Sequence, residues 1–280
     1  MPVVAGVVLA LGSGLLWGCV DFWGGTLSRR APVLAVAAIS QGAGFVGLLV
    51  ALAVVGHVDG ASFRFGLLAG IGGASGLALF YWALSIGTMS IVAPIAACGA
   101  LVPFSLALAR GERPSSLALG GAGLALVGIV AASLEERRSE AAARGRAIVI
   151  AVGSALGIGV FAYFLGRGGQ AGSAFSTLLG ARVVSFGLLA AAVAVARVPL
   201  RLGRATLAQV AVVGLGDLTA NALFALAAHR GLLAIVAVLG SVYPIATVLL
   251  AHAVHGERIT RTQKLGILVA FAGIAAVSAG

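Results

Sequence analysis

The sequence is poor in charged side chains. Asp, Glu, Lys and Arg make up 9% of its 280 residues, whereas 61% of the residues are hydrophobic. A soluble globular domain is about 25% charged and about 45–50% apolar, and its exterior stays wetted. A chain with so few charges cannot supply that exterior. The composition therefore predicts an integral membrane protein whose main solvent is lipid.

Acidic residues are scarcer than basic ones. The chain has 8 Asp and Glu against 18 Lys and Arg, which gives a formal net charge of +10. In a soluble protein this excess would indicate nucleic-acid binding. Here the basic residues lie between long apolar runs, where they meet phospholipid headgroups. Because no basic stripe alternates with aromatic residues, no nucleic-acid partner is expected.

The groups that carry catalytic chemistry are also few. The sequence lacks the phosphate-binding motif G-x-x-x-x-G-K-S/T. Its two cysteines, Cys19 and Cys98, lie inside apolar runs without metal or redox spacing, and we expect no disulfide. The close pair His252 and His255 has no nearby carboxylate except Glu257. We therefore predict no catalytic residue, no metal and no cofactor, and a protein that is not an enzyme.

Long hydrophobic runs are what the sequence has in abundance. A helix needs about 20 apolar residues to cross a bilayer, and these runs are continuous rather than alternating, which excludes a membrane barrel. The first run lacks a basic n-region, so it is interpreted as a retained helix rather than a signal peptide. Ten segments qualify or nearly qualify as transmembrane helices: 3–24, 32–55, 64–86, 89–109, 116–133, 147–166, 172–196, 205–229, 232–254 and 263–279.

The two halves of the chain repeat each other at an offset close to 144 residues. Residues 70–83 (GIGGASGLALFYWA) align with residues 214–227 (GLGDLTANALFALA). Each half later carries Gly-Glu-Arg, at 111–113 and 256–258. Self-similarity in a fixed register indicates duplication. We predict a first five-helix repeat at 1–134, a linker at 135–146 and a second five-helix repeat at 147–280.

The predicted fold class is thus an all-α integral membrane protein with ten transmembrane helices in two inverted five-helix repeats. Five crossings per repeat are an odd number, so the second repeat enters the membrane with the opposite orientation. Secondary transporters built in this way hold their substrate between the repeats near the midplane. Glycine pairs four residues apart, such as Gly14 and Gly18, suit the close helix contacts found in lipid.

These features resemble the drug/metabolite transporter superfamily, specifically its EamA-type ten-helix members. The resemblance rests on the two halves, on Trp17-Gly18 in the first helix, on the two Gly-Glu-Arg motifs and on Tyr243-Pro244. It covers essentially the whole chain and implies a central cavity between the repeats. Members of the superfamily move small metabolites such as amino acids, nucleotide sugars or cationic drugs, so the resemblance does not identify the cargo.

Three charged residues lie inside the predicted helices, namely Asp21, Arg182 and Asp217. A charge near the bilayer centre costs at least ~2.5–3.5 kcal/mol and usually serves a function. Asp217 shares a helix face with Asn221, four residues later, and Arg182 corresponds in the repeat to Gln41. The polar positions lie mainly in the second half, which suits an asymmetric ligand in a pseudo-symmetric cavity.

The sequence leaves the roles of these residues open. Asp217 is the candidate for proton coupling, or it forms a structural ion pair with Arg182, or it binds a substrate amine while Arg182 binds a substrate carboxylate. Asp21 either lines the cavity mouth or caps the helix end. Trp17 and Tyr243 either stack on a ligand or belong to the interfacial aromatic belt. The predicted substrate-binding residues are Trp17, Asp21, Gln41, Arg182, Asp217, Asn221 and Tyr243.

The fourth segment of each half has prolines inside it and a Gly-Glu-Arg turn after it. Pro94, Pro103 and Pro244 predict kinks, which either free backbone carbonyls toward a cavity or only shape the packing. The glutamates of the turns, Glu112 and Glu257, are predicted to hold loop geometry rather than to take part in transport.

The distribution of Lys and Arg bears on orientation. With the N-terminus inside, five of them lie on the cytoplasmic side and twelve on the other, with Arg182 inside a helix. The positive-inside rule therefore favours both termini outside, whereas the family resemblance implies that both are cytoplasmic. Both orientations stay open, with the charge distribution given more weight.

We expect a secondary transporter that moves a small metabolite across the cytoplasmic (inner) membrane by alternating access, with proton coupling as an option. The alternatives are a lipid-linked sugar flippase and a membrane protein without a transport role. The expected partners are a small-molecule substrate and the lipid bilayer. Because one chain contains both halves, a monomer suffices, and a homodimer is also compatible.

Overall fold

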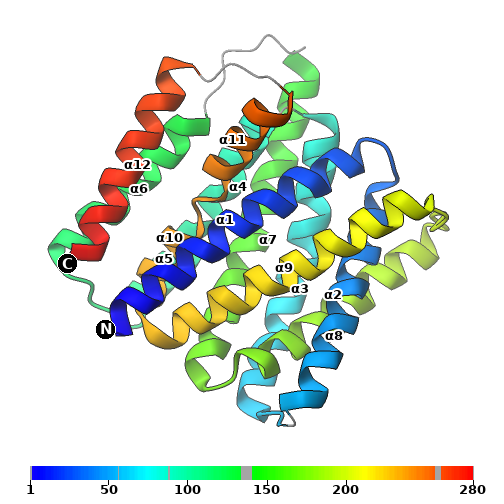
Figure 1. Ribbon diagram of the computed structural model, residues 1–280, viewed down its shortest axis with the longest axis horizontal. Coiled ribbons are helices and arrows are strands. Elements are labelled where there is room, and N and C mark those ends of the chain that lie inside the picture. Colours follow the sequence, from blue (N-terminus) through cyan, green and yellow to red (C-terminus); the bar gives the residue numbers. More distant parts are fainter. Residues whose placement is uncertain (1, 56, 88, 134–140, 256–259, 280) are drawn as a thin grey trace.

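The computed structural model describes residues 2–55, 57–87, 89–133, 141–255 and 260–279 (Figure 1), and in these ranges all regular structure is helical. The first half contains α1 (Pro2–Ser28), α2 (Val33–Val55), α3 (Gly60–Ile86), α4 (Met89–Ala97), the 3-10 turn η1 (Cys98–Ala100), α5 (Leu101–Ala109) and α6 (Ser116–Ser133). The second half contains α7 (Ala141–Ala171), α8 (Ala174–Val195), α9 (Arg204–Arg230), α10 (Leu233–Gly240), α11 (Tyr243–His255) and α12 (Arg261–Ala279).

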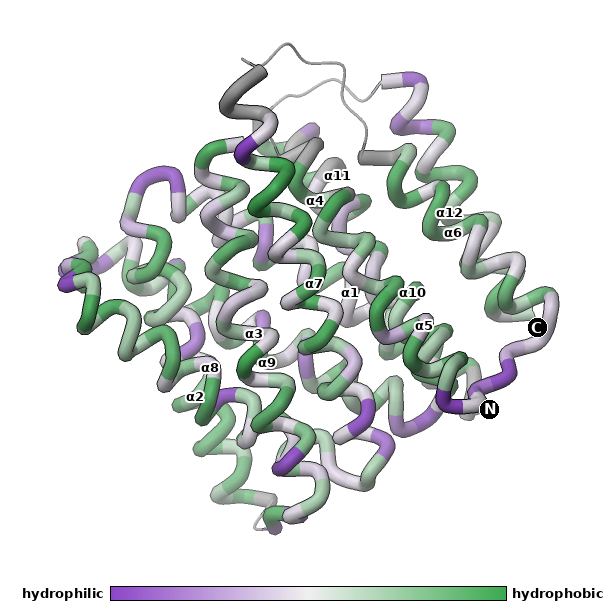
Figure 2. The backbone as a smooth tube through the Cα atoms, turned by 180° about the vertical axis from the view of Figure 1, so that it is seen from behind, coloured by the Kyte–Doolittle hydropathy of each residue, from purple (hydrophilic) through white to green (hydrophobic). Residues whose placement is uncertain are grey.

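Much of this helical structure is long and apolar enough to span a membrane. Seven candidate spans lie in the described residues, the last of which covers both α10 and α11: Val4–Ser28, Val33–Val54, Gly60–Ile86, Gly145–Ala171, Ala174–Val195, Arg204–Arg230 and Leu233–Val254. Shorter apolar helices cover Ile95–Ala109 and Ser116–Ala131. Hydrophilic residues gather mostly at helix ends and connections (Figure 2). The all-helical membrane fold therefore agrees with the prediction, while the number of ten crossings stays a prediction.

Two of the predicted segments are broken near their middles. Segment 89–109 forms α4, the η1 turn and α5, and segment 232–254 forms α10 and α11, which are separated by Ser241 and Val242. Prolines lie beside both breaks, Pro103 near the start of α5 and Pro244 as the second residue of α11. A proline ring removes one backbone hydrogen bond and crowds the preceding turn, so the kinks indicated at Pro103 and Pro244 are helix breaks. Pro94, by contrast, lies inside α4.

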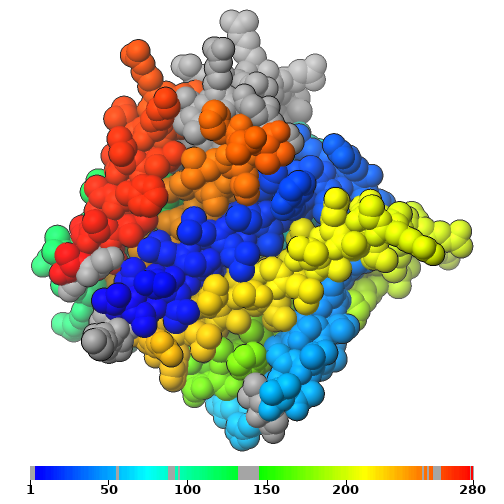
Figure 3. Space-filling model, in the orientation of Figure 1, coloured from blue at the N-terminus to red at the C-terminus, as the bar shows by residue number. Residues whose placement is uncertain are grey.

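The two halves pack against each other through equivalent pairs of antiparallel helices. The first helix of each half packs on the third helix of the other, as α1 on α9 and α7 on α3. Gly6 near the start of α1 lies beside Arg230 at the end of α9, and Val20 lies beside Gly216. Figure 3 shows α1 and α9, in blue and yellow, side by side on one face. The helices α6 and α12 likewise pack together (Figure 1).

Two serines make the same contact in the two halves. The Ser13 hydroxyl of α1 donates to the backbone carbonyl of Ala220 in α9 at 2.8 Å, and the Ser154 hydroxyl of α7 donates to that of Gly76 in α3 at 3.0 Å. All four partners lie in buried helix contacts, where lipid offers a hydroxyl no alternative partner. The internal pseudo-symmetry that the aligned residues indicate is thus expressed in equivalent hydrogen bonds.

Glycines allow these helices to approach closely. A Cβ atom at Gly14 in α1 would lie 2.6 Å from the carbonyl oxygen of Gly240, and one at Gly76 in α3 would lie 2.7 Å from the backbone nitrogen of Ile158. Such distances leave no room for a side chain, and helix association in lipid relies on this kind of close packing. The glycine pairs predicted to serve helix contacts lie at the contacts between the halves.

The helices α3 and α8 begin side by side and cap each other. The Asp59 carboxylate accepts from the Ser62 backbone N–H at 2.7 Å, and the Ser173 hydroxyl accepts from that of Ser176 at 3.1 Å. Across the contact, Asp59 N–H donates to the Ser176 hydroxyl and Ser173 N–H donates to the Ser62 hydroxyl. Hydrogen bonding with Ser62 also holds the pKa of Asp59 below its usual value.

The junction between the halves differs in one respect from the prediction. The expected linker covers 135–146, but α7 begins at Ala141, so the last part of that stretch is helical. Alanine and arginine are both good helix formers, which explains why the helix extends into it. Residues 134–140 lie outside the described part of the chain.

Candidate functional site

The candidate site is a cavity at the seam between the two halves. It is lined by α1 to α5 of the first half, with the η1 turn, and by α7 to α11 of the second half. Both helix breaks contribute to its wall, through Gly99 and Ala100 on one side and Gly240 and Ser241 on the other. Its volume is about 90 Å³. Since one water needs ~10–15 Å³ of such space, the cavity holds several waters or a small solute.

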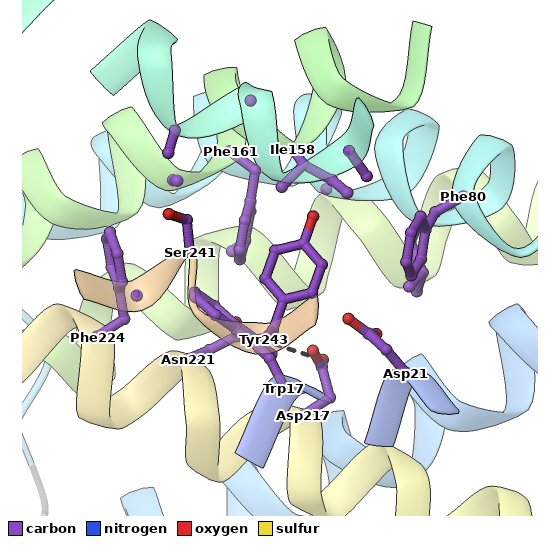
Figure 4. Close-up of a pocket in the computed structure, with 18 of the residues that line it drawn as sticks. Trp17, Asp21, Phe80, Ile158, Phe161, Asp217, Asn221, Phe224, Ser241 and Tyr243 are labelled. Atoms are coloured by element: carbon purple, nitrogen blue, oxygen red, sulfur yellow. Dashed lines mark hydrogen bonds between the residues drawn. The ribbon is translucent and has the colours of Figure 1, made fainter. Parts of the chain in front are cut away.

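The structure brings all the predicted substrate-binding residues to this one cavity. Asp21 and Trp17 come from α1, Gln41 from α2 and Arg182 from α8, while Asp217 and Asn221 come from α9 and Tyr243 from α11. Figure 4 shows several of these side chains converging on the same space. Their grouping in space agrees with the prediction, whereas their role in binding a substrate stays a prediction.

Arg182 is held by partners on two other helices. Its Nη2 donates to Asp217 Oδ2 at 2.6 Å, forming an ion pair, and its Nη1 donates to Gln41 Oε1. The Ser185 hydroxyl, one turn further along α8, donates to the same Gln41 oxygen at 2.9 Å. The Arg182 side chain is 3% exposed and that of Asp217 is 18% exposed. A guanidinium buried to this degree requires such partners, because an unpaired buried charge is very costly.

The network continues from Asp217 to α1. Asp217 Oδ2 also accepts from Gln41 Nε2 at 3.3 Å and from Asn221 Nδ2 at 3.1 Å. The amide oxygen of Asn221 in turn accepts from Trp17 Nε1 at 3.0 Å. One polar network therefore links α1, α2, α8 and α9. Of the interpretations open for Asp217, the ion pair with Arg182 is the contact that the structure contains.

Asp21 differs from Asp217 in its surroundings. Its side chain is partly buried and reaches the cavity one turn after Trp17, on the same face of α1. Among the described residues it has no hydrogen bond and no ion pair. Figure 4 shows the carboxylate pointing into the space beside Tyr243 and Phe80, near Asp217. Of the two roles considered for Asp21, its position is that of a cavity-lining residue.

Aromatic rings form much of the rest of the wall. Tyr243 is 6% exposed, its hydroxyl reaches the carbonyl of Ala93 at 3.5 Å, and its ring packs edge-on against Phe80. Trp17 packs against Phe224 with ring centroids 5.4 Å apart. Trp17 and Tyr243 therefore lie in the cavity wall between the halves.

Several cavity residues were missed by the sequence reasoning, although a signal for some of them existed. Phe80 and Phe224 are equivalent in the repeat, and both line the cavity. Ser185 lies three residues after Arg182 and so on its face of the helix. Gly73 and Leu77, the counterparts of Asp217 and Asn221, line the cavity as well. At these two equivalent positions the wall is polar in α9 and apolar in α3.

Glu112 closes one end of the contact between the halves. It lies in the connection between α5 and α6, and its two carboxylate oxygens accept from the backbone N–H groups of Leu233 and Ala234 at 3.1 and 3.0 Å. Gln170 at the end of α7 donates to it as well, at 3.2 Å. An anion at the exposed N–H groups of a helix start is favourable. Glu112 thus holds the start of α10 across the seam, and not only its own loop; Glu257 lies outside the described residues.

The described residues contain no group of three or more His, Cys, Asp or Glu side chains positioned to hold a metal ion. Cys19 and Cys98 are both free cysteines. The chemistry available at the cavity is therefore that of hydrogen bonds, one ion pair, one further carboxylate and aromatic rings.

Comparison with known proteins gives two findings. The sequence model of the EamA-like transporter family matches this chain twice, over residues 4–134 and again over residues 145–279. A solved crystal structure of a protein superposes with a TM-score of 0.75 at 17% sequence identity, covering 97% of this chain and 94% of the other. At that identity the likeness shows a common fold alone. No curated protein matches the chain.

Proposed function

The chain belongs to the EamA-like transporter family, and from this premise we propose that it carries a small metabolite across the membrane by alternating access. It is a multi-pass integral membrane protein of a family of small-solute transporters. The cytoplasmic (inner) membrane is its proposed location. No chemical conversion of the solute is part of the proposal.

The proposed architecture is ten crossings in two inverted five-helix units, 1–134 and 147–280. Within one unit, successive crossings alternate in direction, so the first and third helices run the same way. The antiparallel packing of α1 on α9 and of α7 on α3 then supports units that are upside down relative to each other. The two matches to the family, one in each half, support the same division.

The position of the polar network is the observation that carries the proposal. It lies at the seam between the halves, beside two helix breaks at equivalent places in the repeat. Transporters with inverted repeats bind substrate where discontinuous helices meet near the bilayer midplane. We assign substrate contact to Trp17, Asp21, Gln41, Arg182, Asp217, Asn221 and Tyr243.

Alternating access needs two packings of the halves that differ little in free energy. In the conformation described, Glu112 holds the start of α10 and the end of α7 together. Opening of the cavity at this end would break these contacts, and the equivalent end would close. Such an exchange moves whole helices against each other without unfolding either half.

Proton coupling through Asp217 would act on the same network. Protonation of Asp217 would remove the charge that Arg182 Nη2 contacts at 2.6 Å, and α8 would lose its ionic link to α9. Because the loss would change the balance between the two packings, a proton gradient could drive the exchange. Covalent fusion of the two halves makes one chain a complete transport unit.

Uptake into proteoliposomes tests the proposed function. Purified full-length protein is reconstituted, and uptake of radiolabelled amino acids and small amines is measured with and without an imposed pH step. Protein-dependent uptake of a water-soluble solute supports the proposal, and acceleration by the pH step supports proton coupling. Transfer of a lipid-linked sugar between leaflets, without any solute uptake, would support the flippase instead.

A further inference from the structure

The charged side chains that line the cavity do not balance. They are the carboxylates of Asp21 and Asp217 and the guanidinium of Arg182. With both carboxylates ionised, two negative charges and one positive charge leave an excess of one negative charge, which a cationic guest would compensate. In the low dielectric of a membrane protein interior, an uncompensated charge strongly selects the sign of whatever enters.

The positive charge is already in use. Both terminal nitrogens of Arg182 have partners, Gln41 and Asp217, and the residue is 3% exposed. A carboxylate on a guest would have to displace Asp217 from the guanidinium before it gained a contact of its own. Asp217 Oδ2 in turn accepts from Arg182, Gln41 and Asn221. Arg182 is therefore not free to hold a carboxylate of a guest, and the charge of Asp217 is already compensated by its ion pair.

Of the three charged residues that line the cavity, Asp21 is the one without a hydrogen-bond or ion-pair partner among the described residues, and it faces the open space. The titratable residues that line the cavity with it are Asp217 of α9, Arg182 of α8 and Tyr243 of α11, and the one cation among them, Arg182, is paired with Asp217. The rings of Trp17, Phe80 and Tyr243 line the cavity around it. A carboxylate bordered by ring faces is the combination that attracts an organic cation.

We propose that Asp21 is the binding site for the positively charged nitrogen of the transported solute, which makes the cargo a small organic ammonium compound. The proposal rests on the transport function given above and names the class of substrate. A metal ion is a poorer guest, because it prefers several oxygen ligands, and the described residues offer no group of three ligating side chains. An ammonium group needs one carboxylate and an apolar or aromatic wall for its carbon skeleton.

Thermal unfolding with three matched probes tests the proposal. Benzylammonium, benzyl alcohol and benzoate share a ring and carry positive, zero and negative charge. A ligand that binds only the folded protein raises its Tm. For the purified full-length protein, benzylammonium should raise the Tm in a saturable way, while the other two probes at equal concentration should not.

Substitutions at Asp21 connect the effect to this residue. Asp21→Asn should weaken benzylammonium binding at least about tenfold, as expected for the loss of a charge-assisted contact. Asp21→Glu keeps the charge and should restore part of the affinity. Asp59→Asn makes the same chemical change at the start of α3, outside the cavity, and should leave the binding curve unchanged.

Three outcomes would overturn the assignment: a larger shift with benzoate or benzyl alcohol, full benzylammonium binding by Asp21→Asn, or no shift with benzylammonium. These results concern the charge of the cargo. The transport function is tested separately by solute uptake into proteoliposomes, so a carrier of neutral or anionic solutes would be recognised as such.

Discussion

Asp21 and Asp217 line the same cavity from adjacent helices, and within the described residues only Asp217 has a cationic partner. Arg182 and two amide side chains surround one oxygen of Asp217, whereas Asp21 points into open space. Two carboxylates with such different surroundings are suited to different tasks. In our account Asp217 joins α8 to α9, and Asp21 receives the charge of the guest.

The ion pair between Arg182 and Asp217 should show strong energetic coupling. Asp217→Asn leaves a buried guanidinium without its counter-charge, and removal of one partner of a buried pair typically costs about 3–5 kcal/mol. We expect about 3 kcal/mol, because Asp217 is 18% exposed. Arg182→Gln should cost less, since the remaining carboxylate keeps amide donors. The measurement is denaturant unfolding of the detergent-solubilised variants.

The double variant completes this cycle. If the pair is coupled, Arg182→Gln combined with Asp217→Asn should cost at least about 1 kcal/mol less than the two single losses added together. Strictly additive losses would show that the two side chains stabilise the fold independently, and the ion pair would then have no part in joining α8 to α9.

Trp17 should matter through its indole N–H as well as its ring. Trp17→Phe keeps an aromatic ring against Phe224 but removes the donor to Asn221, so it should cost about 1 kcal/mol of stability. Trp23→Phe is the matched control, because Trp23 is on the same helix and 46% exposed. Equal Tm values for the two variants would show that the hydrogen bond from the Trp17 indole to Asn221 does not stabilise the fold.

Close packing of α3 on α7 predicts opposite signs for two identical substitutions. Gly76→Ala places a Cβ atom 2.7 Å from the backbone nitrogen of Ile158 and should destabilise by about 1–3 kcal/mol. Gly123→Ala in α6 meets nothing within 4 Å and should be neutral or stabilise by up to about 1 kcal/mol, since alanine favours a helix interior. A stabilising Gly76→Ala in the same unfolding assay would contradict the packing described.

Glu112 should stabilise the packing of one half against the other, because its hydrogen bonds reach the start of α10 in the second half. Glu112→Gln loses the negative charge at the start of α10 and should cost about 1 kcal/mol. If the contact closes one end of the cavity, the variant should also open more often at that end. Hydrogen exchange of the α10 amides measures this, and unchanged exchange rates would assign Glu112 a role in its own loop alone.

Much of the fold follows from the sequence because the hydrophobic runs and the repeat are strong signals. The helical segments, the prolines beside both breaks and the glycines at helix contacts were all indicated. A charged residue in an apolar helix is so costly that it usually serves a function. Asp21, Arg182 and Asp217 were singled out for this reason, and all three line the cavity. Their counterparts and helix-face neighbours, such as Gln41 and Asn221, line the same cavity, and their role in substrate binding stays a prediction.

Other features depend on how the helices rotate and pack, which the sequence does not contain. An almost wholly apolar helix has no polar stripe to indicate its inward face, so Phe161 could not be separated from lipid-facing residues. Helix spacing placed Asp217 near Asn221, but it did not decide between Arg182 and a substrate as its partner. The contact from Glu112 to α10 joins segments more than a hundred residues apart, beyond any local pattern.

Two-sided access to the cavity is the central claim, and thiol labelling of Ser241 tests it most directly. Ser241→Cys lines the cavity, and it is placed in a variant that lacks Cys19 and Cys98. An impermeant methanethiosulfonate with a trimethylammonium group is then applied from either side of reconstituted membranes. The account predicts labelling from both sides. Labelling from one side only under every condition, or from neither side, would contradict alternating access around this cavity.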